Sequence, residues 1–422
     1  MTDLPDPPRV VRTMVRRAMI PALLLTATPV AAQLALPHIP DVVSGTLRTV
    51  TDTVRAAPEI PSRVAALAQT RLDRIATMLR EHRTDLAPDD HGDPARAGTV
   101  LVSDPDDALI AAATAAGFVL AERGDLEGLG IGFARFDVPL GKSLVDGLRT
   151  MRKLARGHDV SADQVHFESG AVAHAATPSA SAAQGPMSGA IGMIDGGVGA
   201  VDAPVTRRGF AAGAPSPDNH GTAIASLLIG GGGVRGAAVG ARLYAADVYG
   251  KDPAGGNALA IAKALAWLAS VHVPVTVISL VGPANPLLAR VVAAVQTRGM
   301  IVVAAVGNDG PAAPPSYPAS YPGVIAVTGV DGRGRALIEA GRSLHLDYAA
   351  PGADMLAATA QGGSAPVRGT SFAAPLVAAR LARLGGNRAA AVKAADSEAR
   401  KAGPASRYGR GILCESCRTP AK

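Results

Sequence analysis

The sequence predicts an α/β fold in which a parallel sheet is covered by helices on both faces. From about residue 190 onward, short stretches rich in Val, Ile and Ala alternate with longer stretches that have helical spacing. The short stretches are almost continuously apolar, which is typical of strands buried on both faces of a parallel sheet. In such sheets catalytic groups lie beyond the carboxyl ends of the strands.

The individual elements follow from local signals. Asn257 is a suitable N-cap for the helix after it. Pro375 falls in a first helical turn, where its missing N–H has no partner to lose. The expected strands are residues 190–194, 242–248, 273–280, 300–306 and 324–330, and the expected helices are 222–229, 258–270, 286–298 and 372–384.

Composition narrows the class of protein. At 422 residues the chain has room for two or three domains, and 48 Gly and 32 Pro imply many turns without a periodic repeat. From residue 186 onward 22 Lys and Arg face 13 Asp and Glu, a net charge of +9, whereas residues 33–185 carry −5. No basic helix or aromatic stripe indicates a nucleic-acid partner, so complementary halves of one precursor explain the asymmetry better.

The N-terminus resembles a secretory signal. Arg16 and Arg17 close a basic region, an apolar run follows from residue 19, and small residues precede Gln33. The run is short and interrupted by proline, which disfavours a membrane span. We therefore expect a signal peptide over 1–32 and a secreted or periplasmic protein with no stable membrane span after cleavage; an uncleaved anchor is the alternative.

Two further segments precede the main sheet. Residues 33–96 form an extension with one amphipathic helix, at 64–83, and a linker at 89–94. Residues 97–168 have the order strand, helix, strand, strand, helix, strand, which predicts a small ferredoxin-like α+β module.

A linker and a short tail flank the parallel-sheet region. Residues 169–187 are small, flexible and almost uncharged, as expected of an exposed segment open to proteolysis. In the tail, 414–422, Cys414 and Cys417 are too few for a tetrahedral zinc site and lack the context of a thioredoxin-like motif. In an exported chain they favour a disulfide.

Four polar residues stand where a catalytic site would lie. Asp195 ends the first strand, and His220 stands before an apolar helix. Asn308 follows another strand, where its amide is placed to donate to an oxyanion, although a turn role is equally compatible. Ser371 lies at a helix N-terminus, where free N–H groups favour a nearby oxyanion; a simple cap is the ordinary explanation for a single serine there.

Taken together and in this order, the residues resemble the subtilisin-like serine proteases. The matching motifs cover residues 193–198, 220–222, 279–283, 305–308, 369–375 and 408–411, within a catalytic domain expected over 188–413. The chain order Asp, His, Ser is the one known for subtilisin. The module at 97–168 is similar to the inhibitory propeptides of such enzymes.

The resemblance implies a role for each residue. Ser371 is the nucleophile, His220 the base, Asp195 its orienting partner, and Asn308 an oxyanion donor. No metal or cofactor is implied; a structural calcium ion is compatible with the family but cannot be placed. The implied partners are protein or peptide substrates and the chain's own propeptide. The implied substrate-binding residues are Ser279, Leu280, Val281, Gly282, Ala305, Val306, Gly307 and Ser316.

The function expected from this resemblance is that of a secreted, self-processed serine endopeptidase. A processing protease or peptide ligase with the same acyl-enzyme is one alternative, and a non-catalytic binding scaffold is another. Val281 and Val306 add bulk where the family often has Gly or Ala, so a small or medium apolar residue before the scissile bond is expected to be preferred over Phe or Tyr. The Ala- and Ser-rich linker fits that preference as the first substrate.

Overall fold

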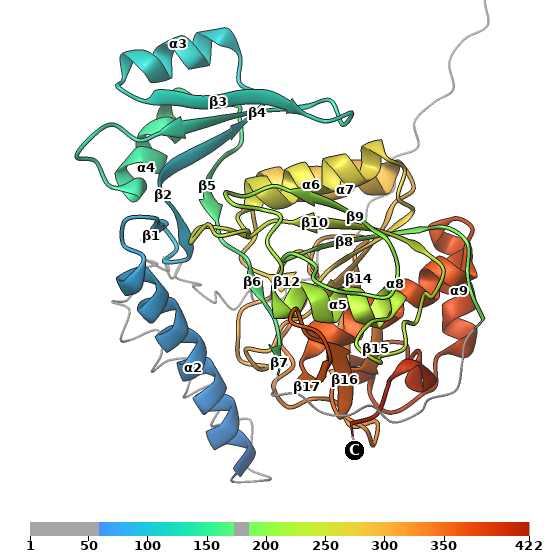
Figure 1. The fold of residues 1–422 in the computed structure, drawn as a ribbon. Helices are drawn as coiled ribbons and strands as arrows, with labels where there is room; N and C mark the ends of the chain where they lie inside the picture. The colour runs from blue at the N-terminus through green and yellow to red at the C-terminus, as the bar shows by residue number, and fades with distance from the viewer. Residues whose placement is uncertain (1–58, 173–184, 422) are drawn as a thin grey trace, which may run out of the picture. The chain divides into compact units, whose positions relative to one another are not determined.

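Figure 1 shows the computed structural model, which describes residues 59–172 and 185–421. The expected signal peptide and most of the expected linker lie outside the described residues. Among the helices that are described, none is both long and apolar enough to cross a membrane.

A seven-stranded, fully parallel sheet forms the centre of residues 185–421, in the order β15-β14-β13-β11-β8-β10-β9. The expected strands are present, but residues 273–280 divide at Ser279 into β11 and a separate short strand, β12. The edge strand β9 was not predicted, since it is largely exposed and polar. The bounds are β8 Ala190–Asp195, β9 Val205–Gly209, β10 Arg242–Asp247, β11 Val275–Ile278, β12 Leu280–Val281, β13 Ile301–Ala305, β14 Ile325–Val330 and β15 Tyr348–Pro351.

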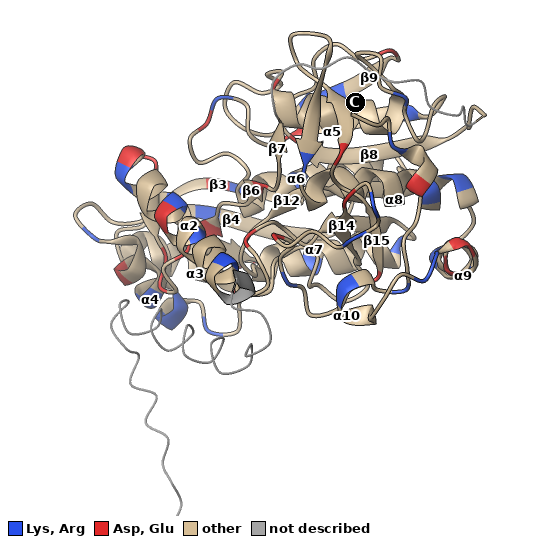
Figure 2. Ribbon diagram, turned by 90° about the horizontal axis from the view of Figure 1, so that it is seen from below, with Lys and Arg blue, Asp and Glu red and all other residues tan. Residues whose placement is uncertain are grey.

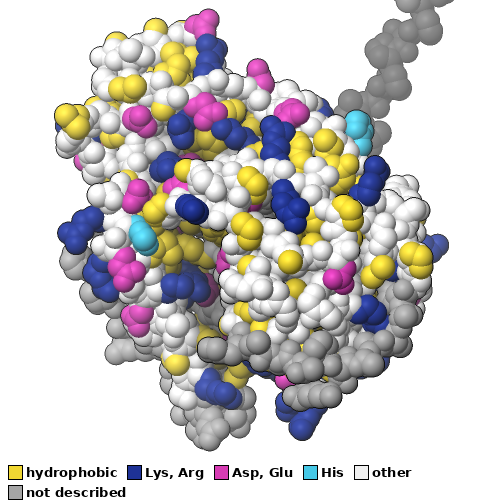
Figure 3. Space-filling view, viewed as in Figure 1, with side chains coloured by type: hydrophobic (Ala, Val, Ile, Leu, Met, Phe, Trp, Pro, Cys, Tyr) yellow, Lys and Arg dark blue, Asp and Glu magenta, His cyan; other side chains and the backbone are white. Residues whose placement is uncertain are grey.

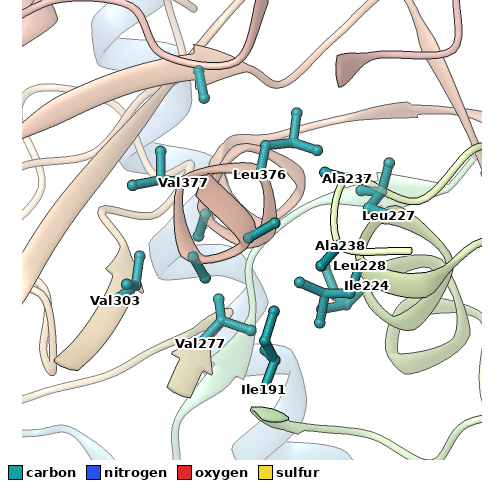
Figure 4. Packing of buried hydrophobic residues seen from close by; sticks show 14 of the residues in the cluster. Ile191, Ile224, Leu227, Leu228, Ala237, Ala238, Val277, Val303, Leu376 and Val377 are labelled. Carbon is teal, nitrogen blue, oxygen red and sulfur yellow. The ribbon is translucent and has the colours of Figure 1, made fainter. Parts of the chain in front are cut away.

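Helices cover both faces of this sheet (Figure 1). Helices α5 (Asn219–Ile229) and α8 (Thr370–Leu384) pack on one face, and α6 (Ala258–Ser270) and α7 (Pro286–Thr297) on the other. Consecutive strand residues serve opposite faces, so Val277 belongs to the α5–α8 core and Ile278 to the α6–α7 core. Figure 4 shows Val277 and Val303 directed at α8. Burying such a side chain contributes about 1.5–3 kcal/mol.

The remaining elements complete the parallel-sheet domain. A hairpin of β16 (Met355–Ala358) and β17 (Ser364–Arg368) leads into α8. Helices α9 (Arg388–Glu398) and α10 (Ala405–Tyr408) follow, and the tail ends in a 3₁₀ turn, η1 (Glu415–Cys417). Cys414 and Cys417 are joined by a disulfide.

The N-terminal module is a separate antiparallel sheet with its own core. Strand β2 pairs with β4 and β5, and β4 also pairs with β3, while α3 and α4 pack on the sheet. The sheet begins earlier than expected, because residues 89–93 form the loop of a β1–β2 hairpin rather than a linker. The bounds are β1 Leu86–Pro88, β2 Pro94–Ser103, α3 Asp107–Ala115, β3 Val119–Leu126, β4 Ile131–Asp137, α4 Leu144–Leu154 and β5 Val160–Gln164.

Ion pairs join the module to the parallel-sheet domain. Lys263 Nζ donates to Glu122 Oε1 at 2.5 Å, Arg208 pairs with Glu127 at 3.1 Å, and Arg290 bonds Asp104. In these three pairs the acid belongs to the module and the base to the sheet domain, as the charge asymmetry suggests. The pair between Arg96 of the module and Asp252 of the sheet domain has the opposite sense. Figure 3, seen from the same side as Figure 1, shows several Lys and Arg side chains in dark blue on this side of the molecule.

Helix α2 (Glu59–Glu81) carries charges of both signs (Figure 2) and contacts the sheet domain near Asn308. Arg74 donates to Asp309 at 2.9 Å, and Arg71 lies 3.4 Å from the same carboxylate. The Arg74 guanidinium also lies 5.5 Å from the centroid of the Phe167 ring.

Candidate active site

Asp195 and His220 form a buried hydrogen-bonded pair. Asp195 is the last residue of β8, and its Oδ1 accepts from His220 Nδ1 at 2.8 Å and from the Gly196 N–H at 2.8 Å. His220 lies in the first turn of α5, which begins at Asn219, three residues before the predicted start at 222. The helix approaches the strand end so closely that a Cβ at Gly221 would lie 2.2 Å from the Gly196 carbonyl oxygen. Glycine at 221 therefore allows His220 to reach Asp195.

The electrostatic surroundings favour the protonated form of His220. Burial by itself lowers the pKa of this imidazole, but the Asp195 carboxylate, its hydrogen bond and the nearby Glu168 and Asp218 together raise it to about 9. The ring also packs against Phe372, with centroids 5.4 Å apart. Its Nε2 is buried and has no hydrogen-bond partner among the described residues. In the neutral ring this nitrogen can accept a proton, and in the protonated ring it can donate one.

Ser371 lies in the first turn of α8 and is fully buried. The turn before it needs glycine, because Gly369 has a φ of 146° and a Cβ there would lie 2.7 Å from Asn308 Nδ2. The Ser371 hydroxyl contacts the carbonyl oxygen of Ser169, the Ser169 hydroxyl at 2.9 Å and the Ser279 carbonyl oxygen at 3.0 Å. It makes no hydrogen bond to His220 in this state.

Asn308 connects the end of β13 to the start of α8. Its Oδ1 accepts from the Thr370 N–H at 3.0 Å, and its Nδ2 donates to the Ser169 hydroxyl at 3.3 Å. The amide is therefore held in place by its oxygen while its N–H group faces the same residue that Ser371 contacts. Asn308 thus anchors the start of α8 through its side-chain oxygen and donates a hydrogen bond toward Ser169 through its side-chain nitrogen.

An extended segment of the chain itself crosses this site. Strand β6 (Phe167–Glu168) pairs antiparallel with β12, and β7 (Ala171–Val172) pairs antiparallel with β17. Ser169 and Gly170 lie between these two pairings, and the Ser371 N–H donates to the Ser169 carbonyl oxygen at 3.2 Å. The sequence predicted a flexible linker from residue 169, so the ordered strand at 171–172 corrects its beginning.

The expected substrate-binding residues fall into two groups. Val281, Gly282, Val306, Gly307 and Ser316 line a pocket of about 90 Å³ beside Phe167. Leu280 and Ala305 are fully buried and outside its lining, and Ser279 instead donates to the Ser371 carbonyl oxygen at 2.9 Å. The Val281 side chain narrows the pocket because it packs close to Gly307. A Cβ atom built on Gly307 would lie only 3.3 Å from Val281 Cγ1.

Several residues of the site were missed by the sequence. Glu168 is partly buried beside His220, and its removal from water raises its pKa to about 8. Phe372 packs on His220, and Thr370 Oγ1 accepts from the Gly307 N–H at 3.0 Å. Asp218 caps α5 by accepting from the Gly221 N–H. The position of Asp218 before the helix is a capping signal that the sequence contains, whereas nothing local marks Glu168.

Two groups among the described residues have the ligand atoms for a cation. Asp89, Asp90 and His91 lie in the hairpin loop, where Asp89 already accepts from two backbone N–H groups. Glu168, Asp195 and His220 have ligand atoms within 4.8 Å of one another, but the Asp195–His220 hydrogen bond occupies the atoms that a cation would need. Neither group is assigned a metal.

The chain is similar to known proteins in sequence and in fold. Residues 207–400 match the family described as the subtilase family. Subtilisin BL of Lederbergia lenta is 35% identical over 180 residues, which are 41% of this chain and 66% of that protein. Subtilisin E of Bacillus subtilis strain 168 is 33% identical over 189 residues, 42% of this chain and 49% of that protein. The chain thus spans just under two thirds of the first relative and about half of the second.

The fold also matches a solved structure. Fervidolysin from Fervidobacterium pennivorans, a keratinolytic enzyme related to subtilisin, superposes with a TM-score of 0.64 at 17% identity, covering 76% of this chain and 61% of that one. At this identity the match concerns the fold alone. The family match, the related sequences and the parallel sheet agree, and residues 207–400 are therefore assigned to the subtilase family.

Proposed function

We propose that this chain is a serine endopeptidase that acts through Asp195, His220 and Ser371 and is made as a precursor that processes itself. One observation carries the proposal. A main-chain carbonyl, that of Ser169, accepts the Ser371 N–H at 3.2 Å within an extended segment paired on both sides, next to the buried Asp195–His220 pair. This is how a peptide substrate is expected to lie in a protease.

The roles of the residues follow from the chemistry of acyl transfer. A serine hydroxyl becomes a strong nucleophile only when a base takes its proton, so His220 Nε2 accepts the Ser371 proton as Oγ attacks the carbonyl carbon. The protonated imidazole then gives that proton to the leaving amine, and water hydrolyses the acyl-enzyme by the same steps in reverse. Asp195 keeps the proton of the neutral ring on Nδ1 through the 2.8 Å hydrogen bond. To begin this sequence, the Ser371 hydroxyl turns from the Ser169 oxygens to His220.

The oxyanion of the tetrahedral intermediate needs donors aimed at one point. The Ser371 N–H at the start of α8 supplies one, strengthened by the positive end of the helix. Asn308 Nδ2 supplies the other after a small displacement from the Ser169 hydroxyl, which it contacts at 3.3 Å. The hydrogen bond from Thr370 to Asn308 Oδ1 limits the motion of the amide.

The proposal of an inhibited precursor is supported by the segment of residues 167–172, which lies across the candidate active site. The α+β module joins the segment at 167–172, and that segment occupies the place of a substrate. While it remains there, no other peptide reaches Ser371, so the module inhibits the enzyme. The basic and apolar N-terminal residues, and a disulfide between Cys414 and Cys417, favour export to an oxidising compartment.

An activity-based probe tests this function. A fluorophosphonate reagent should label the mature wild-type protein at Ser371, and Ser371→Ala should give no label and remain an uncleaved precursor. Ser397→Ala, an exposed serine of α9, is the matched control and should be labelled and processed like the wild type. Normal processing of purified Ser371→Ala would refute the assignment.

A further inference from the structure

The segment that fills the cleft is held in one register. On one side Phe167 pairs with Val281 and Glu168 with Leu280. On the other side Ala171 pairs with Arg368 and Val172 with Val367. Residues 169 and 170 lie between the two paired strands β6 and β7 and belong to neither. The Ser371 N–H bonds the Ser169 carbonyl oxygen, so the peptide bond between residues 169 and 170 lies at the start of α8.

The polar contacts of the site converge on Ser169. Its carbonyl oxygen accepts the Ser371 N–H at 3.2 Å and contacts the Ser371 hydroxyl, and its own hydroxyl accepts from Asn308 Nδ2 at 3.3 Å. Among the described residues these contacts mark one carbonyl carbon as the group that Ser371 Oγ attacks.

The residue after this bond has no room for a side chain. A Cβ built on Gly170 would lie 2.5 Å from Phe372 Cε2 and 3.0 Å from Phe372 Cζ. The Phe372 ring is fully buried and packs against His220, so it cannot move aside without disturbing the base. Phe372 is the residue directly after the nucleophile, and its ring therefore closes the space on the leaving-group side.

We propose that the enzyme cuts its own chain between Ser169 and Gly170, and that Phe372 restricts the residue after the scissile bond to glycine. This rests on the proposed function and adds the bond and the specificity to it. Ser371 Oγ bonds to the Ser169 carbonyl carbon, and the bond to the Gly170 nitrogen breaks. That nitrogen takes its proton from His220, and water then releases the Ser169 carboxylate from Ser371. The products are a module that ends at Ser169 and an enzyme that begins at Gly170.

The first test is the C-terminus of the released module. Mass spectrometry of the wild-type protein during maturation should find a module fragment ending at Ser169, which later trimming of the enzyme does not alter. Gly170→Ala should slow self-cleavage about 10–200-fold, the cost expected for one misplaced methyl group. Gly185→Ala is the control for a glycine-to-alanine change elsewhere in the chain, because a Cβ there meets nothing within 4 Å, and it should mature at the wild-type rate.

The second test is whether a smaller or more flexible side chain at position 372 restores the rate of self-cleavage lost in Gly170→Ala. Gly170→Ala combined with Phe372→Met should recover much of the lost rate, since a flexible side chain can give way; Phe372→Leu is a second choice should methionine impair folding. In trans, mature enzyme should cut the peptide of residues 164–172 faster than its counterpart with alanine at position 170, by a similar factor.

The outcomes separate this proposal from the proposed function. A probe-labelled, mature enzyme whose module ends elsewhere, or which cuts the glycine and alanine peptides equally well, would overturn the Ser169–Gly170 assignment and leave the protease standing. Failure of the probe to label the protein would overturn the function on which the proposal rests. A fragment ending at Ser169 together with rescue by Phe372→Met would support both.

Discussion

We expect the charges around His220 to set the pH dependence of the proposed self-cleavage. Burial lowers the pKa of this imidazole, but Asp195, Glu168 and Asp218 together raise it to about 9 while the segment occupies the cleft. The base must be neutral to accept the Ser371 proton, so the rate of self-cleavage should rise with pH until about 9. Near pH 7 only about 1% of the molecules hold a neutral His220, and each further unit should raise the rate about tenfold.

Removing the Glu168 carboxylate should shift this profile. Glu168→Gln keeps the size and backbone pairing of the residue and removes one of the negative charges that raise the pKa of His220. The midpoint of self-cleavage should move to lower pH, and the gain in rate should be largest between about pH 8 and about pH 9, where Glu168 of the wild type is ionised and His220 is still protonated. Because burial raises the pKa of Glu168 to about 8, the wild-type profile should reflect two coupled ionisations and the variant profile one.

The assay is a pH series of single-turnover self-cleavage. Denatured precursor is diluted into buffers from about pH 6 to about pH 10, and loss of the full-length chain is followed by mass spectrometry. Glu127→Gln, at an exposed carboxylate of the module that pairs with Arg208, is the matched control and should leave the midpoint unchanged. An unchanged or higher midpoint in Glu168→Gln would refute the reasoning, because it would mean that the segment does not hold this carboxylate beside His220 in solution.

Three further predictions concern the site and the tail. Asn308→Ala should lower kcat about 10²–10³-fold, a figure that comes from subtilisin itself, whereas Asn308→Asp retains the acceptor for the Thr370 N–H and should show the same loss of rate with a smaller change in Tm. Val281→Ala should widen the 90 Å³ pocket and raise kcat/KM for peptides with Phe before the scissile bond relative to Ala; an unchanged ratio would contradict the narrowed-pocket argument. Replacing Cys414 and Cys417 together by serine should cost up to about 2 kcal/mol of unfolding free energy, measured by denaturant titration, because the loop they close is short.

Local patterns in the sequence were sufficient to predict the parallel sheet and the polar residues at the carboxyl ends of its strands. Apolar runs predicted strands β8, β10, β13 and β14, because burial on both faces leaves no alternation of polar residues. The same patterns placed Asp195 at a strand end and Ser371 at a helix N-terminus. Edge strand β9 escaped because its exposed, polar residues carry no signal of burial.

What lies in the cleft depended on contacts between distant parts of the chain. The sequence by itself determined the α/β class, because strand and helix periodicity is local. Its motifs carried the resemblance to the subtilisin-like proteases, with four candidate polar residues and a small module before the sheet. Only the tertiary structure decided that Ser169 meets Ser371, 202 positions away, and that Phe372 leaves no space beside Gly170. Backbone pairing of β6 and β7 with β12 and β17 sets this register, and main-chain hydrogen bonds do not depend on side-chain identity, so no pattern along the chain records them.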